Sequence, residues 1–342
     1  MERFGEAIIA SRHPAHSPEW YAARRESVGA SEVAGVLGLG DPRYSSPAKV
    51  WAEKVGDELS FTGNVATEIG TKIERAILDR FGVVMRRAFW RGDALQLRHA
   101  DTARLAANLD GWVGILQSGT VYPVPVEAKR TADHHGHATK QWDALEAWLS
   151  GDGGYDAWAR TQIEGYYVQV QAQIAIVGAE YGYLVGCIGG EASTKLLLGM
   201  DLDDKEFRVL KIPRNDALIQ KMVVGVEAFW TRYVEANRCP PVTEHDYDAI
   251  HAARRQATAG KEIHRRDLRG LVRSMQREQA KEARARQRIK AIKARLLAEV
   301  GDAETLHAGD ITVTAKTQAR KGYTRVVKPS VVRAISIEGK KK

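Results

Sequence analysis

The chain has 342 residues, of which 44% are hydrophobic and 27% are charged, an ordinary balance for a globular protein with a sizeable core. No apolar run approaches the ~20 residues that cross a bilayer, and the first residues lack a signal-peptide pattern, so we expect a cytoplasmic protein without a membrane span. The two cysteines, Cys187 and Cys239, exclude a disulfide framework and an iron–sulfur cluster held by this chain alone.

The net charge of +8 is unevenly distributed along the chain. Residues 1–253 carry 27 basic and 34 acidic side chains, whereas residues 254–300 carry 15 and 5, and residues 301–342 carry 9 and 4. Because clustered basic side chains attract polyanions, the argument from charge for a nucleic-acid partner rests on the C-terminal quarter.

The N-terminal two thirds alternate helix-like and strand-like stretches. Residues 18–56 are predicted to be helical and loop-rich, with Pro18 near a helix start. The apolar periodicity of residues 62–81 predicts an amphipathic helix that ends at Gly82. After it we expect strands at 83–90, 95–100, 111–116 and 121–129, a helix at 139–150, a loop at 151–154, an apolar helix at 161–178, strands at 181–188 and 194–201, and a helix at about 204–237.

The C-terminal part is predicted to form separate units. The helix expected at about 204–237 stops before Pro240-Pro241, which marks a boundary and gives a first domain at 1–240. Residues 241–300 form a basic helical extension, and residues 301–342 a small β-unit and basic tail with a turn at 308–310. The basic helix is expected either to grip duplex DNA or to serve as an oligomerisation arm, and its charge favours DNA.

A D-G pair at residues 110–111 is followed by E-x-K at residues 127–129. Because residues two apart in a strand share a face, Glu127 and Lys129 project together, and Val126 and Ala128 point into a core. With Asp110 beside them, two carboxylates and one ammonium would converge, which suits Mg²⁺ or Mn²⁺ and phosphate chemistry. A surface salt bridge on a β-hairpin is the alternative interpretation of the same residues.

Further polar residues occur at spacings that allow them to join this site. Glu74 follows Gly70 by one helical turn, so a helix packed on the sheet could aim its carboxylate at the same metal. The stretch Tyr166–Gln171 places glutamines in an apolar helix, where buried amides need partners. Arg24 and Ser31 flank a turn and offer a guanidinium and a hydroxyl to a phosphate.

The ordered set W-x3-R-x6-S-E-V, G-x3-E, D-G, E-x-K and Y-x2-Q-V-Q resembles the phage lambda exonuclease family, or YqaJ-type viral recombinases, among the PD-(D/E)xK nucleases. The resemblance covers about residues 15–240. It implies an α/β fold with a restriction-endonuclease-like core, in which helices flank a mixed central β-sheet. The basic helical extension and the small β-unit have no counterpart in the compact family members, and neither does the inserted sequence at about 133–160.

The resemblance also implies roles for individual residues. Asp110, Glu127 and the Ala128 carbonyl resemble the metal ligands, and Glu74 the helix carboxylate that completes the site. Lys129 resembles the catalytic lysine.

In the same family pattern, Gln171 resembles the glutamine that holds the attacking water, with Gln169 and Tyr166 in support. Arg24 and Ser31 resemble the pocket for a 5′-terminal phosphate.

The implied activity is a Mg²⁺-dependent 5′→3′ exonuclease, with Mn²⁺ as a possible substitute, that acts on double-stranded DNA ends and leaves 3′ overhangs. Such enzymes supply a single-strand annealing protein, and some are homo-trimers. An endonuclease of the same fold and a non-catalytic DNA-binding recombination scaffold are the alternatives. The histidine-rich loop 134–137 is expected to be a plain loop, and Trp142, Trp148 and Trp158 are expected to pack rather than to stack on bases.

Overall fold

The computed structural model describes residues 2–13, 17–56, 65–92, 95–117, 120–133 and 135–317. The chain divides into two compact units, Met1–Arg254 and Arg255–Lys342. Among the helices in these ranges, none has both the length and the apolar character that crossing a membrane requires.

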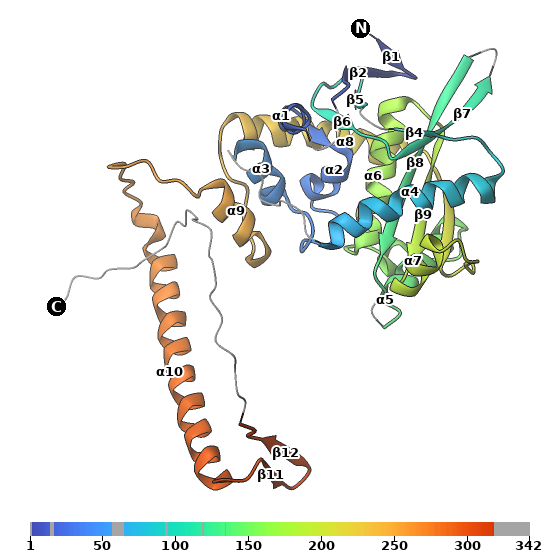
Figure 1. Cartoon of the computed structure of the whole chain (residues 1–342). Helices are drawn as coiled ribbons and strands as arrows, with labels where there is room; N and C mark the ends of the chain where they lie inside the picture. Colours follow the sequence, from blue (N-terminus) through green and yellow to red (C-terminus); the bar gives the residue numbers. More distant parts are fainter. Residues whose placement is uncertain are drawn as a thin grey trace. The chain divides into compact units, whose positions relative to one another are not determined.

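The first unit contains two mixed sheets and the helices that cover them (Figure 1). Its helices are α1 (Pro18–Arg25), α2 (Ala30–Leu37), α3 (Pro47–Val55), α4 (Val65–Met85), α5 (His137–Leu149), α6 (Gln162–Val177), α7 (Gly190–Leu197), α8 (Asp216–Phe229) and α9 (Tyr247–Ala253). Its strands are β1 (Arg3–Phe4), β2 (Ala7–Ser11), β3 (Val28–Gly29), β4 (Trp90–Arg91), β5 (Gln96–Arg98), β6 (Leu105–Ala107), β7 (Gly111–Gln117), β8 (Thr120–Thr131), β9 (Tyr181–Ile188) and β10 (Phe207–Pro213).

The central sheet has the strand order β10-β9-β8-β7-β4. Strands β8 and β9 are parallel, and the other neighbouring pairs are antiparallel. A smaller sheet has the order β1-β2-β5-β6-β3. The expected α/β fold, a mixed sheet flanked by helices, is therefore confirmed.

Alternation along the strands gives the central sheet two buried faces. On one face Val126 of β8 and Val185 of β9 pack with the apolar side of α4, including Ile77 and Phe81. On the other face Leu184 of β9 joins the larger core that contains α6. Helices α4 and α6 thus cover opposite faces of the sheet, and the odd-numbered residues Glu127 and Lys129 of β8 belong to the α6 side.

The structure places the boundary between units later than the Pro240-Pro241 prediction. Helix α9 packs on α3, and the buried Asp246 accepts hydrogen bonds from the Ser46 hydroxyl and from the Thr243 backbone and hydroxyl. Ser46 also caps α3 by accepting from the Lys49 amide. Residues 241–254 therefore belong to the first unit, because these buried polar contacts join them to it.

We expect Asp246→Ala to destabilise the first unit by about 2 kcal/mol, because charge-assisted hydrogen bonds of a buried carboxylate are lost. Burial alone would raise the pKa of Asp246, but the bonds from Ser46 and Thr243 outweigh it and lower the pKa. The lowered pKa stabilises the fold above the unfolded-state value of about 3.9, and this contribution disappears as the pH falls through the folded-state pKa. Denaturant unfolding between pH 7 and pH 3 should show the two proteins converging in acid; a constant difference would contradict the assignment.

Three predicted elements differ from the structure. Residues 83–85 continue α4, and the expected strand at 83–90 shrinks to β4. The predicted strand at 194–201 is wrong, since α7 occupies Gly190–Leu197 and buries Ala192 and Leu196 against α4. The predicted helix at 204–237 is split, because β10 precedes α8 and the π-helical segment Trp230–Glu235.

The second unit contains α10 (Arg269–Val300) and a two-stranded sheet of β11 (Thr305–Ala308) and β12 (Ile311–Thr314). The turn predicted at 308–310 is confirmed, and Gly309 adopts the positive φ of 67° that the tight turn needs. The basic helical extension predicted at 241–300 is interrupted after α9, at residues 254–265, and its most basic part is α10.

Candidate active site

The antiparallel register of β7 and β8 brings the D-G pair at 110–111 next to the E-x-K segment at 127–129. Gly111 pairs with Val126, so Asp110 lies beside Glu127 across the two strands. The Ala128 amide donates a 2.9 Å hydrogen bond to Asp110 Oδ2. This bond holds the first carboxylate against the E-x-K segment, as the sequence predicted.

Glu127 is the centre of a buried polar cluster. Its side chain is 1% exposed, and Lys129 Nζ lies 2.5 Å from its Oε1 atom. Gln169 Nε2 donates to Oε1 and Gln173 Nε2 donates to Oε2, both at 2.6 Å. A buried carboxylate needs such partners, and here they come from β8 and from α6.

One face of α6 supplies the polar groups. Tyr166, Gln169 and Gln173 recur at three- and four-residue spacing and therefore share a face. The Lys129 ammonium lies 5.1 Å from the centre of the Tyr166 ring, in cation–π range. Gln173 was not singled out in the sequence, although its position one turn after Gln169 was a signal for it.

The structure does not bring Gln171 to this cluster. Its amide nitrogen donates to the Pro213 carbonyl at 2.6 Å, and its carbonyl oxygen accepts from the Asn215 amide at 2.9 Å. Both groups are therefore used to fix the connection between β10 and α8. The role that the sequence gave to Gln171 fits Gln169, which contacts Glu127.

The two glutamines predict opposite phenotypes. Gln169→Ala should slow hydrolysis about 10–100-fold, because it removes a bond that orients Glu127. The loss of stability should be small, because Lys129 and Gln173 still pair with the Glu127 carboxylate. Gln171→Ala should lower the free energy of unfolding by about 1–3 kcal/mol and keep the rate, because it leaves buried backbone groups without partners. Single-turnover rates and denaturant unfolding separate the two effects, and a slow but stable Gln171→Ala protein would overturn this assignment.

The charges of the cluster perturb one another. Burial, followed by the negative charges of Glu127 and Glu74, raises the pKa of Asp110 well above its ordinary value. Glu74 on α4 therefore acts on the same site. Burial alone would lower the pKa of Lys129, but Glu127 and Asp110 outweigh it and raise that pKa, so the lysine is an ammonium at neutral pH.

The cluster has features that suit a divalent cation. Burial and then repulsion from Glu127 and Glu74 raise the pKa of Asp110, and a bound cation would relieve that repulsion. The buried Gln173 Oε1 has no hydrogen-bond partner among the described residues. Within the described ranges, no three His, Cys, Asp or Glu side chains form a group that could hold a metal ion. Mg²⁺ needs no such group, because one or two carboxylates, waters and substrate phosphates complete its shell.

A pocket of about 210 Å³ opens beside the cluster. Lys129, Tyr166 and Gln169 line it together with Ser31 and Tyr44. Ser31 stands in the first turn of α2, so the structure brings this predicted phosphate contact to the same pocket as the predicted catalytic lysine.

Arg24 is held near the start of α2 by a buried acid. Its guanidinium lies 3.2 Å from Glu32 and stacks over the Trp20 ring at 4.8 Å. Glu32 also accepts from the Gly29 amide and lies 2.6 Å from the buried Lys54 ammonium. These contacts place a fixed cation at the end of α1, next to the turn into α2.

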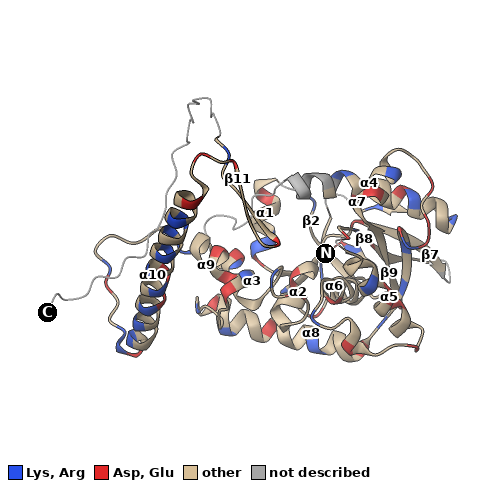
Figure 2. Ribbon diagram, turned by 90° about the horizontal axis from the view of Figure 1, so that it is seen from below, with Lys and Arg blue, Asp and Glu red and all other residues tan. Residues whose placement is uncertain are grey.

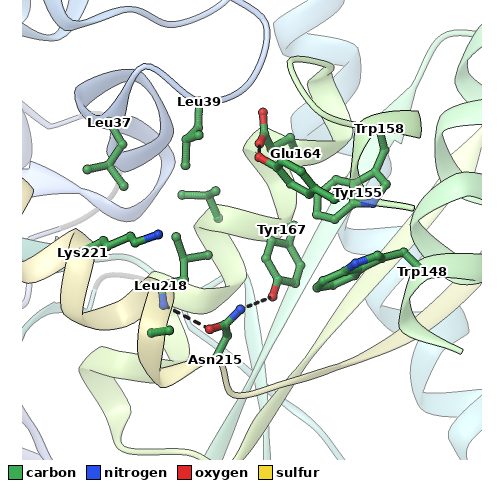
Figure 3. A pocket seen from close by; sticks show the side chains of 12 residues that line it. Leu37, Leu39, Trp148, Tyr155, Trp158, Glu164, Tyr167, Asn215, Leu218 and Lys221 are labelled. Carbon is green, nitrogen blue, oxygen red and sulfur yellow. Dashed lines mark hydrogen bonds between the residues drawn. The ribbon is translucent and has the colours of Figure 1, made fainter. Parts of the chain in front are cut away.

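A second pocket, of about 400 Å³, lies on the other side of α6 (Figure 3). The aromatic rings of Trp148, Trp158 and Tyr167 form one of its walls and contact one another. Asn215 donates to the Tyr167 hydroxyl and accepts from the Leu218 amide, so its side chain is already bonded. Packing, as predicted, is the role of these tryptophans.

Trp142 and the histidine-rich loop 134–137 lie in the same part of the chain, at about 133–160. Trp142 is 1% exposed and packs in the same core. His135 and His137 are exposed at the start of α5, and His134 lies outside the described residues.

All residues of the buried polar cluster lie in a segment of the chain that matches a protein-family model. Residues 19–180 match the model of the YqaJ-like viral recombinase domain. The resemblance to this family is thereby confirmed. The YqaJ-like segment extends from α1 to the end of α6 and includes Arg24, Asp110, Glu127, Lys129 and Gln169.

The chain is also similar to the uncharacterized protein YqaJ of Bacillus subtilis (strain 168), with 24% identity over 236 residues. This alignment spans 68% of the present chain and 61% of the length of that relative.

Two solved structures have partial similarity to this chain. The alkaline exonuclease LHK-Exo from Laribacter hongkongensis has a TM-score of 0.44 and 23% identity, over 65% of this chain and 94% of that one. A phage related exonuclease from Haemophilus somnus 129PT has a TM-score of 0.43 and 14% identity, over 62% and 95%.

Proposed function

We propose that this protein is a Mg²⁺-dependent deoxyribonuclease that degrades the 5′ strand of duplex DNA from an end and leaves a 3′ overhang. The observation that carries the proposal is the convergence of Asp110, Glu127 and Lys129 beside a pocket within the YqaJ-like segment. Two acids and a lysine at the ends of adjacent strands are groups that phosphodiester hydrolysis uses.

A divalent metal at this site would be held by Asp110 and Glu127, with the Ala128 carbonyl and Glu74 as further ligands. When bound, it supplies Lewis-acid activation of the phosphate and of the attacking water. Mn²⁺ has similar ligand preferences and is expected to substitute.

The chain's own residues bind and orient the reactants. The Lys129 ammonium stabilises the negative charge that develops on the phosphate oxygens, because its raised pKa keeps it protonated. Gln169 and Gln173 fix the Glu127 carboxylate from α6. Gln169 also lines the pocket, where its amide can orient the attacking water.

Arg24 and Ser31 bind the 5′-terminal phosphate in this proposal. Arg24 offers a guanidinium held by Glu32 and Trp20, and Ser31 offers a hydroxyl at the start of α2. A phosphate fixed there selects a DNA end rather than an internal bond.

The test compares a 5′-phosphorylated linear duplex, its 5′-hydroxyl counterpart and a closed circle, each with Mg²⁺. We expect rapid loss of the 5′ strand of the first, slower loss from the second and an intact circle. A linearised or nicked circle would instead indicate an endonuclease of the same fold. Absence of hydrolysis with every substrate and metal would favour a non-catalytic recombination scaffold.

We further propose that the 3′ overhang passes to a single-strand annealing protein. A homo-trimer or another homo-oligomer would keep the enzyme on its strand. Analytical ultracentrifugation of the whole chain, with and without duplex DNA, tests the oligomer.

A further inference from the structure

Helix α10 has a high density of basic residues, which are blue along its ribbon in Figure 2. Its 32 residues contain ten Arg or Lys and three Glu. All ten basic side chains are exposed. Seven of them are arginines, whose planar guanidinium groups can form paired hydrogen bonds with phosphate.

Five of these arginines lie in one row. Arg273, Arg277, Arg284, Arg288 and Arg295 follow one another at intervals of four, seven, four and seven residues. At about 100° per residue, the five fall within an arc of about 60°. The row is about 33 Å long at 1.5 Å per residue, close to the ~34 Å of one turn of duplex DNA.

The acids of α10 leave this row largely uncompensated. Glu278 pairs with Lys281, and Glu282 pairs with Arg286. Both glutamates lie about 100° or more around the helix from the centre of the arginine row, whereas the third, Glu299, lies about 50° from it, one turn after Arg295. Apart from this last arginine, the row presents its positive charge to the solvent, where an external anion can match it.

A second copy of α10 matches this helix poorly. Leu271, Met275, Ile289 and Ile292 fall on one seam of alternating four- and three-residue steps, as in a coiled coil. Glu278 and Glu282 occupy the same seam between Met275 and Ile289 and interrupt its apolar character.

Four positions that flank the seam are basic, with Lys281 and Arg288 on one side and Arg286 and Lys293 on the other. Two copies would bring these like charges together, which opposes self-association. Charge complementarity therefore favours a polyanion over a second copy.

We propose that the arginine row of α10 binds the sugar-phosphate backbone of duplex DNA without requiring an end or a sequence. The choice of duplex DNA as the polyanion rests on the proposed function. Such a contact on the same chain raises the local concentration of substrate at the YqaJ-like segment. The second unit is then a DNA-holding module.

The test is a variant of the whole chain with Arg273, Arg277, Arg284 and Arg288 replaced by Gln, which keeps helix propensity. Binding to a closed circular duplex is measured without divalent metal, so that neither ends nor hydrolysis contribute. We expect the slope of log affinity against log salt to become shallower by about 0.9 for each lost phosphate contact, hence by about 3–4. The Kd at ~0.1 M salt should rise at least about tenfold.

Two control variants distinguish the effect of the arginine row from the effect of the total charge of the protein. Replacing the same four arginines by Lys should preserve most of the slope. Replacing Lys205, Lys211, Arg232 and Arg238, which are exposed on the first unit, by Gln removes equal charge and should leave the slope nearly unchanged.

An unchanged slope in the four-Gln row variant overturns the proposal, and so does an equal loss in the first-unit control. Loss of self-association with normal DNA binding would assign α10 to an oligomer interface and overturns it as well. Hydrolysis of a short linear duplex is measured in parallel, because it reports on the nuclease proposal alone.

Discussion

Glu127→Gln is expected to lower the rate of duplex hydrolysis by about 10²–10³-fold or more. The substitution keeps the shape of the side chain but removes the negative charge that Lys129, Gln169 and Gln173 surround. It also removes one of the two carboxylates proposed to hold the metal. Single-turnover degradation of an end-labelled duplex measures the loss.

Glu206→Gln is the matched control, because Glu206 also pairs with a lysine, Lys195, at 2.6 Å in the same unit. It should hydrolyse DNA at nearly the wild-type rate. Thermal unfolding of both variants identifies any general loss of structure. A Glu127→Gln protein that is folded and fully active would refute the proposed site.

Lys129→Met is expected to reduce the rate by about 10²–10³-fold with little change in DNA affinity. The ammonium is proposed to act on charge that exists mainly in the transition state, so kcat should fall while KM changes little. Steady-state kinetics with a 5′-phosphorylated duplex separate the two parameters.

Lys129→Arg serves as the charge-retaining variant and should recover part of the lost rate. Lys195→Met removes the lysine of the other ion pair and should have no effect on kcat. If Lys129→Met instead raised KM at constant kcat, the lysine would be a binding residue rather than a catalytic one.

The pairing of D-G with E-x-K was predictable because it depends on local rules. Alternation along β8 places Glu127 and Lys129 on one side and Val126 on the other. This arrangement does not depend on which elements pack against the sheet. The long amphipathic helix before it and the apolar helix after it have strong periodicity, and α4 and α6 agree with their predicted ranges within a few residues in the described part of the chain.

The choice among the glutamines of α6 was not predictable in the same way. Periodicity says that Gln169 and Gln173 share a face and that Gln171 does not. It does not say which face meets the sheet, because most residues of α6 are apolar and buried. Packing of α6 between β8 and the loop before α8 decides that Gln171 binds backbone and Gln169 binds Glu127.

Short elements were misread for a related reason. The apolar run at 194–201 is compatible with a strand or a helix, since so short a run carries too little periodicity to separate them. The helix α7 forms there because Ala192 and Leu196 are one turn apart and both reach the core beside α4. Arg208 lies within the helix predicted at about 204–237, but the structure places it on β10. There its side chain is buried and forms ion pairs with Asp143 and Glu146 on α5.

The sequence alone was enough to identify Asp110, Glu127 and Lys129 as candidate site residues, because their arrangement depends on residue type and on the geometry of near neighbours. It also located the excess of basic residues in the C-terminal quarter of the chain. Which amide orients Glu127, where the first unit ends and which pocket Ser31 enters depended on contacts between residues far apart in the chain. Those contacts depend on how buried surfaces fit together, and a one-dimensional pattern does not contain that fit.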